Sequence, residues 1–139
     1  MKALAVAVIA ACIATPVALA KFRMTMTLGD STPRAGHRFT VIVHTEQAIP
    51  PNDYIKLIAV APGEDWYQVV GTVTGDASRT HADIPHDGFQ IKLVRVGPKM
   101  WRAVTRLPRP GRWRLLVPNG TKDGFMMPPP LVRWVRVSP

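Results

Sequence analysis

Short segments in which apolar and polar residues alternate run through most of the chain. In residues 22–28 the apolar side chains of Phe22, Met24, Met26 and Leu28 alternate with polar ones, so a strand here has one apolar and one polar face. The same reasoning predicts further strands at residues 39–47, 54–61, 66–73, 89–95, 101–107, 113–117 and 131–137. Residues 54–61 are more continuously apolar, which indicates a strand buried on both faces.

Glycine and proline separate these segments at intervals of about eight to twelve residues, the spacing typical of a β-sandwich. No segment after residue 20 has a convincing helical period. Residues 75–88 are polar and residues 119–130 end in a proline run, so both are predicted loops. We therefore predict an all-β fold, an immunoglobulin-like antiparallel β-sandwich of seven to nine short strands.

The first 20 residues have the features of a secretory signal peptide. Lys2 supplies a positive charge, residues 3–14 are uniformly apolar, and residues 18–20 (Ala-Leu-Ala) fit the site that signal peptidase cuts. Cleavage before Lys21 leaves residues 21–139 as a single domain. We therefore predict an exported protein, periplasmic or extracellular.

The only cysteine, Cys12, lies within this segment and leaves two alternatives open. Residues 9–12 (Ile-Ala-Ala-Cys) resemble a bacterial lipobox, in which the cysteine is lipidated and becomes the new N-terminus. An uncleaved anchor is the other alternative, although a span needs about 20 apolar residues and Pro16 interrupts this run. Once residues 1–20 are removed, no cysteine is left for a disulfide, so stability has to come from packing.

Positive charge is concentrated in the C-terminal part of the chain, which carries a net charge of +9 overall. Residues 21–90 contain six basic and eight acidic residues, whereas residues 91–139 contain eleven basic residues and one acid, Asp123. Such asymmetry indicates a surface that contacts an anionic partner. Outside the cytoplasm this partner is expected to be an acidic protein or an anionic envelope component, with a membrane surface as another option, and not a nucleic acid.

Arginine and tryptophan alternate in this basic part. Arg102 and Arg106 are expected on the strand face opposite Trp101, and Arg112 and Arg114 on the face opposite Trp113. If these neighbouring strands pair, their arginines form one patch that selects carboxylate or phosphate groups. The last strand extends the patch, and the predicted binding residues are Trp101, Arg102, Arg106, Arg112, Arg114, Arg133, Trp134 and Arg136. The alternative is a solvated face on which arginine stems cover apolar surface.

The polar segment 81–87 is the best candidate for a metal site. His81, Asp83 and His86 offer imidazole and carboxylate ligands of the kind that suit zinc or copper. The alternative is a solvated loop. Met24 and Met26 are predicted to fill the core, whereas residues 126–127 (Met-Met) could offer thioethers to copper(I).

No pattern in the chain indicates catalysis. There is no nucleophile elbow, phosphate-binding loop or dinucleotide fingerprint. Glu64 and Asp65 are adjacent, and adjacent residues of a strand point apart, so they do not suggest a two-carboxylate site. We therefore expect no enzymatic activity.

Two patterns resemble those of small exported YtkA-like domains and, more distantly, of CopC-like copper carriers. They are Pro33-x-Ala35-Gly36-x-x-Phe39-x-Val41-x-Val43 and Trp101-x-Ala103-x-x-x-Leu107-Pro108-x-Pro110-Gly111-x-Trp113-x-Leu115-x-Val117. The resemblance implies an immunoglobulin-like sandwich. For the copper carriers it also implies a histidine at the mature N-terminus, where this chain has Lys21, so copper binding does not follow from it.

Together these observations favour an exported, non-catalytic binding or accessory module whose basic face is built of arginine and tryptophan side chains. A periplasmic copper carrier and a purely structural sandwich domain are the alternatives.

Overall fold

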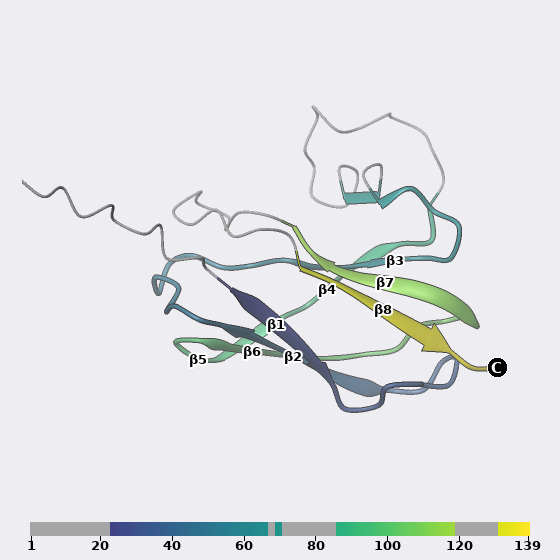
Figure 1. Ribbon diagram of the computed structural model, residues 1–139, viewed down its shortest axis with the longest axis horizontal. Coiled ribbons are helices and arrows are strands. Elements are labelled where there is room, and N and C mark those ends of the chain that lie inside the picture. Colours follow the sequence, from purple (N-terminus) through teal and green to yellow (C-terminus); the bar gives the residue numbers. More distant parts are fainter. Residues whose placement is uncertain (1–22, 67–68, 71–85, 119–130) are drawn as a thin grey trace, which may run out of the picture.

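Two antiparallel sheets of four strands each form the protein in the computed structural model, which describes residues 23–66, 69–70, 86–118 and 131–139. The first sheet has the order β1-β2-β6-β5 and the second the order β4-β3-β7-β8 (Figure 1). The strands are β1 Met24–Leu28, β2 Phe39–Thr45, β3 Leu57–Val60, β4 Phe89–Ile91, β5 Val94–Gly97, β6 Met100–Thr105, β7 Gly111–Val117 and β8 Leu131–Val137. The predicted all-β sandwich is confirmed.

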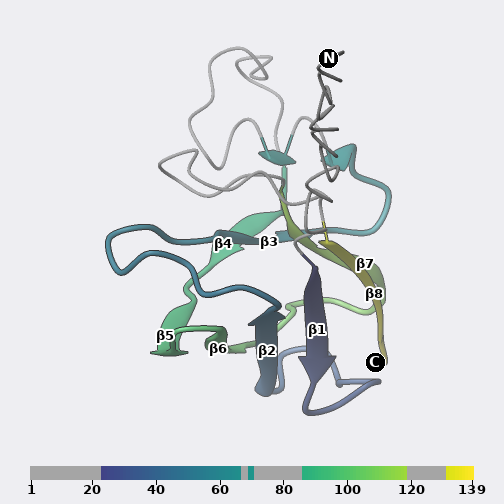
Figure 2. The ribbon, with the colours of Figure 1, turned by 60° about the vertical axis from the view of Figure 1, so that its left-hand side comes forward.

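The core lies between the two sheets, which face each other as layers (Figure 2). Val41 and Val43 of β2 meet Leu57 of β3 and Leu115 of β7 in one buried cluster, because alternate residues of each strand point inward. Met24 and Met26 belong to this cluster, which confirms their predicted packing role. Residues of β3 are buried on both faces, also as predicted.

Trp113 is the largest fully buried side chain and holds the β6–β7 connection in place. Its indole N–H donates a hydrogen bond to the backbone carbonyl of Arg109, at 2.9 Å. Phe89 packs against the indole edge to face, with the ring centroids 6.2 Å apart. One side chain therefore fills the core and also fixes the corner where the chain passes from the first sheet to the second.

The predicted strand at residues 66–73 is wrong at the three of its residues that the structure describes, 66, 69 and 70, and the others lie outside the described residues. Trp66, Val69 and Val70 have helical backbone, and the Val69 N–H donates to the Asp65 carbonyl at 3.1 Å. This helical turn packs on the outer face of the second sheet, which is apolar at this place and is stabilised when its side chains are removed from water. Val69 and Val70 bury its residues in a second, smaller cluster with Ile58, Val60 and Leu116.

The predicted strand at residues 89–95 is divided between the two sheets. Ile91 of β4 pairs with Leu57 in the second sheet, whereas Val94 of β5 pairs with Arg102 in the first. Alternation alone does not reveal this change of sheet, because both strands keep the same period of two residues.

Arg95 serves the fold itself. Its guanidinium donates hydrogen bonds to several backbone carbonyls and lies 4.8 Å from the centroid of the Trp101 ring. The carbonyl partners belong to Ile49, Pro50, Gly97 and Pro98. Arg95, one of the basic residues of the C-terminal part, therefore connects β5 to the loop around residue 50 through hydrogen bonds.

Within the described ranges, no helix is long and apolar enough to cross a membrane. The predicted signal peptide, residues 1–20, lies outside the described residues, as do the loop residues 75–85 and 119–130. Cleavage, lipidation and export therefore stay predictions.

Candidate binding surface

The topology separates the arginines that the sequence analysis placed together. β6 lies in the first sheet and β7 in the second, so the prediction that these strands pair is wrong. Arg102 is exposed on the outer face of the first sheet, and Arg106 is exposed just after β6. Trp101 is 4% exposed and belongs to the core, where it is not accessible to a partner. The physical reason is the connection at residues 106–110, which crosses between the sheets instead of forming a hairpin.

Arg133 also lies apart from the arginines of β7. It stands opposite Leu115, which faces the core, whereas Trp134 stands opposite Arg114 on the outer face. Arg133 therefore lies on the face of β8 opposite to that of Trp134. It is exposed there because β8 is the edge strand of its sheet.

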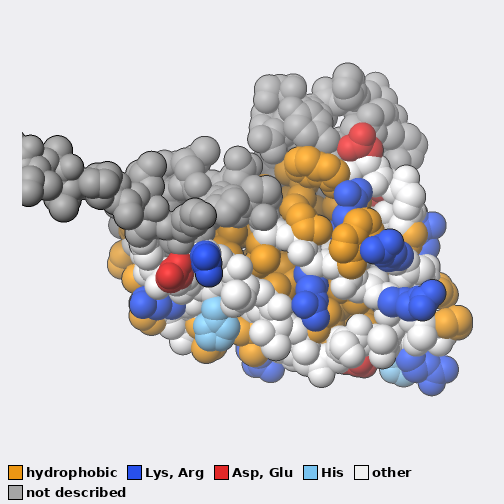
Figure 3. Space-filling view, viewed as in Figure 1, with side chains coloured by type: hydrophobic (Ala, Val, Ile, Leu, Met, Phe, Trp, Pro, Cys, Tyr) orange, Lys and Arg blue, Asp and Glu red, His pale blue; other side chains and the backbone are white. Residues whose placement is uncertain are grey.

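Four of the predicted binding residues do come together, on the outer face of β7 and β8. In the register of these strands Arg114 lies opposite Trp134, and Arg112 lies opposite Arg136. We call these four residues the Arg/Trp face. The guanidinium carbons of Arg112 and Arg114 lie 4.2 and 5.1 Å from the centroid of the Trp134 ring, within cation–π distance. In the space-filling view, basic and hydrophobic side chains alternate over β7 and β8 (Figure 3).

Arg114 connects this face to the loop before the helical turn. Its guanidinium donates to the backbone carbonyl of Glu64 at 2.9 Å. The Glu64 carboxylate in turn accepts the backbone N–H groups of Ala61, at 3.0 Å, and of Asp87. Glu64 therefore holds the turn and the start of the 86–88 segment together, and Arg114 has a structural role beside any role in binding.

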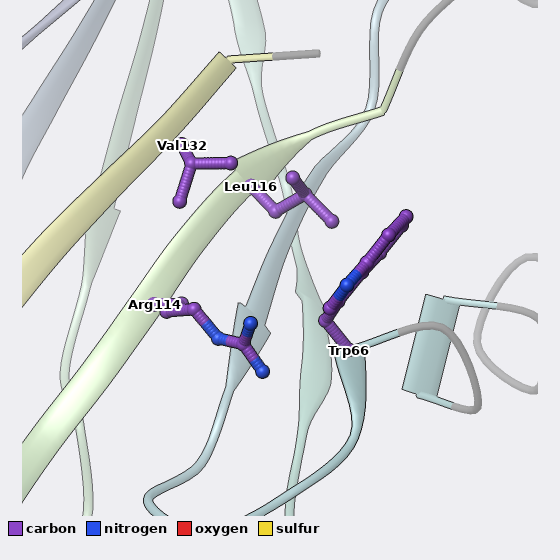
Figure 4. Close-up of a pocket in the computed structure, with 4 residues that line it drawn as sticks. All are labelled: Trp66, Arg114, Leu116 and Val132. Atoms are coloured by element: carbon purple, nitrogen blue, oxygen red, sulfur yellow. The ribbon is translucent and has the colours of Figure 1, made fainter.

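An apolar pocket of about 190 Å³ adjoins the Arg/Trp face (Figure 4). Leu116 and Val132 line it from the strands, and the Trp66 indole stands across from Leu116 and Arg114 (Figure 4). Trp66 is 37% exposed and Val132 is 46% exposed, although both are large and hydrophobic. Exposed apolar residues gathered at one hollow are typical of an interaction site.

A second, open hollow of about 550 Å³ lies at the other end of the face. Arg112, Trp134 and Arg136 line it together with Ser31, Gly111 and Val137. Within the described part of the chain, neither Arg112 nor Arg136 has a carboxylate at ion-pair distance, whereas Arg109 pairs with Asp87 at 3.1 Å. As far as the described residues go, the hollow therefore presents two exposed guanidinium groups with no carboxylate beside them.

The opposition of Arg112 and Arg136 predicts a gain in stability when one charge is reversed. Like charges directly across a strand pair are destabilising and opposite charges are stabilising. We expect Arg136→Glu to raise the free energy of unfolding above that of Arg136→Gln by about 0.5 kcal/mol. Urea denaturation of the two variants at low salt measures this difference. A Glu variant less stable than the Gln variant would show that a carboxylate at position 136 does not interact favourably with Arg112, which would contradict the opposition of the two side chains on this face.

The pocket residues Trp66, Leu116 and Val132 were not among the predicted binding residues. A signal for Trp66 was present in the sequence: Trp66, Val69 and Val70 have the spacing i, i+3, i+4 of a helical face. The signal is short, and the pocket itself depends on the register between β7 and β8, which no local pattern reveals.

The predicted metal site is only partly within the described residues. His81 and Asp83 lie outside them. The Nδ1 atom of His86 lies 2.8 Å from the carbonyl oxygen of Gly88, which assigns the proton to Nδ1 and leaves Nε2 as the nitrogen that could coordinate a metal. No group of three or more His, Cys, Asp or Glu side chains in the described ranges could hold an ion. Zinc or copper binding by these three residues stays a prediction.

Comparison with known proteins adds no further constraint. No family model matches the chain, and no curated protein or solved structure is detectably similar to it.

Proposed function

We propose that this protein is an exported, non-catalytic binding module whose Arg/Trp face contacts an acidic protein or an anionic envelope component. The observation that carries the proposal is the pairing of Arg112 with Arg136 across β7 and β8 with no carboxylate beside them in the described residues. Keeping two like charges opposite each other costs stability. A carboxylate supplied by a partner would remove this cost, and guanidinium groups bind carboxylates through two parallel hydrogen bonds.

We also propose that the sandwich is immunoglobulin-like. The orders β1-β2-β6-β5 and β4-β3-β7-β8 correspond to the immunoglobulin sheets A-B-E-D and C-F-G, with β4 added beside β3. The bond from the Trp113 indole to the Arg109 carbonyl supports this reading. It occupies the corner where immunoglobulin-like domains have a tyrosine that bonds back to the preceding backbone.

Binding to labelled poly-L-glutamate tests the proposed function. We expect fluorescence anisotropy to show binding that weakens as the NaCl concentration rises, because exposed charge interactions are screened. Replacing Arg112 and Arg136 together with glutamine should weaken binding at least about tenfold, since charge-assisted hydrogen bonds to carboxylates are the strong ones.

The matched control is the double variant Arg102→Gln/Arg106→Gln. It removes the same net charge from exposed positions away from the Arg/Trp face. We expect its affinity to stay within about twofold of the wild type. Equal losses in both double variants would mean that only the net charge of the protein matters, which would contradict the proposal.

A further inference from the structure

The outer face of β7 and β8 is graded from apolar to basic along the strands. Three cross-strand pairs follow one another on this face: Leu116 with Val132, Arg114 with Trp134, and Arg112 with Arg136. The first pair lines the apolar pocket and the last pair lines the basic hollow, with Trp134 between them. A ligand that covers the whole face therefore meets one apolar site and one cationic site in a fixed order.

The register also gives the distance between the two sites. Arg112 and Leu116 are four positions apart on one strand, which corresponds to about 13 Å at the usual rise of a strand. An extended polypeptide along this face would place side chains four positions apart at both sites, because its rise per residue is the same.

The pocket suits a single large side chain. Its volume of about 190 Å³ exceeds that of an apolar cavity of about 150 Å³ that holds benzene. Trp66 and Leu116 provide apolar walls on opposite sides of it (Figure 4).

We propose that the occupant of this face is an extended acidic segment of another protein, with a leucine- or phenylalanine-sized side chain in the pocket and a carboxylate between Arg112 and Arg136. This proposal rests on the proposed function and specifies its partner. Charge complementarity selects the acidic group, and the pocket selects a discrete side chain in preference to a membrane surface, which would contact a basic face without a defined spacing.

Selection from a displayed library of random peptides tests the proposal, with the full-length folded protein as bait. We expect the bound peptides to carry a large apolar residue and an Asp or Glu about four positions apart. Val132→Glu, which puts a carboxylate at the pocket, should abolish the enrichment of the apolar residue. Val104→Glu is the matched control, because Val104 is 52% exposed on the outer face of the other sheet.

The possible outcomes separate this proposal from the proposed function. Acidic peptides without an apolar residue at a preferred spacing would overturn the two-site ligand and leave anion binding intact. Binding to vesicles that contain phosphatidylglycerol, with no peptide enriched, would overturn the acidic segment as the occupant. If the Arg112→Gln/Arg136→Gln variant and the wild type select the same peptides equally well, both proposals are overturned. The thermal unfolding temperature of each variant is compared with that of the wild type. Equal temperatures verify that a failure to select peptides does not result from a loss of folding.

Discussion

Reversing both charges of the basic hollow, Arg112→Glu together with Arg136→Glu, should weaken binding to poly-L-glutamate about a hundredfold or more. Each substitution removes a donor of charge-assisted hydrogen bonds, worth about 1.5–3 kcal/mol, or about tenfold or more in affinity. The new carboxylates also repel an acidic ligand. Fluorescence anisotropy at low salt measures the loss.

The choice of these two arginines follows from their contacts. Arg114 is left unchanged because its guanidinium holds the Glu64 carbonyl, so its loss would disturb the turn beside the pocket. Arg102→Glu/Arg106→Glu makes the same change of net charge away from the Arg/Trp face and should reduce affinity far less. If the two double variants lose affinity to the same extent, the Arg/Trp face is not the binding surface.

Trp113→Ala should be the most damaging single substitution for the fold. Trp113 is 0% exposed and the largest fully buried side chain, and removing such a side chain costs about 3–5 kcal/mol. Because a domain of this size is stable by only about 5–15 kcal/mol in total, the variant should be largely destabilised or unfolded. Urea denaturation followed by circular dichroism measures the change.

Trp113→Phe separates packing from hydrogen bonding at the same position. Phenylalanine keeps an aromatic ring in the core but loses the N–H that bonds the Arg109 carbonyl. Losing a hydrogen bond of this kind costs about 0.5–1.5 kcal/mol, so this variant should lie between the wild type and Trp113→Ala. Trp134→Ala is the control, since Trp134 is 48% exposed and its removal should cost about 1 kcal/mol or less. Equal stability losses at positions 113 and 134 would contradict the corner role of Trp113.

Much of the fold could be predicted from the sequence because each strand buries one face. The alternation in β1, β2, β6 and β7 is set by a local requirement, that every second side chain enters the core. The helical turn at Trp66 could not be predicted so well. It forms because Ile58 and Leu116 leave apolar surface on the outside of the second sheet, and these two residues lie side by side only because β3 pairs with β7.

The candidate site was only partly predictable for the same physical reason. Arg112 and Arg114 share a face by local alternation, so their grouping follows from the sequence alone. Whether Arg102 joins them depends on which strands pair, and the chain changes sheet between β6 and β7. The pocket beside Val132 depends on the β7–β8 register, which is again a long-range property.

Site-specific photo-crosslinking in the cells that naturally produce the protein tests the central claim most directly. A photoreactive phenylalanine analogue replaces Val132, beside the Arg/Trp face, or Val104, on the outer face of the other sheet, two valines of similar exposure. The binding-module account predicts a discrete adduct from position 132 that disappears in the Arg112→Glu/Arg136→Glu background, and none from position 104. An adduct from position 104 alone, or an adduct from position 132 that persists after charge reversal, would contradict it.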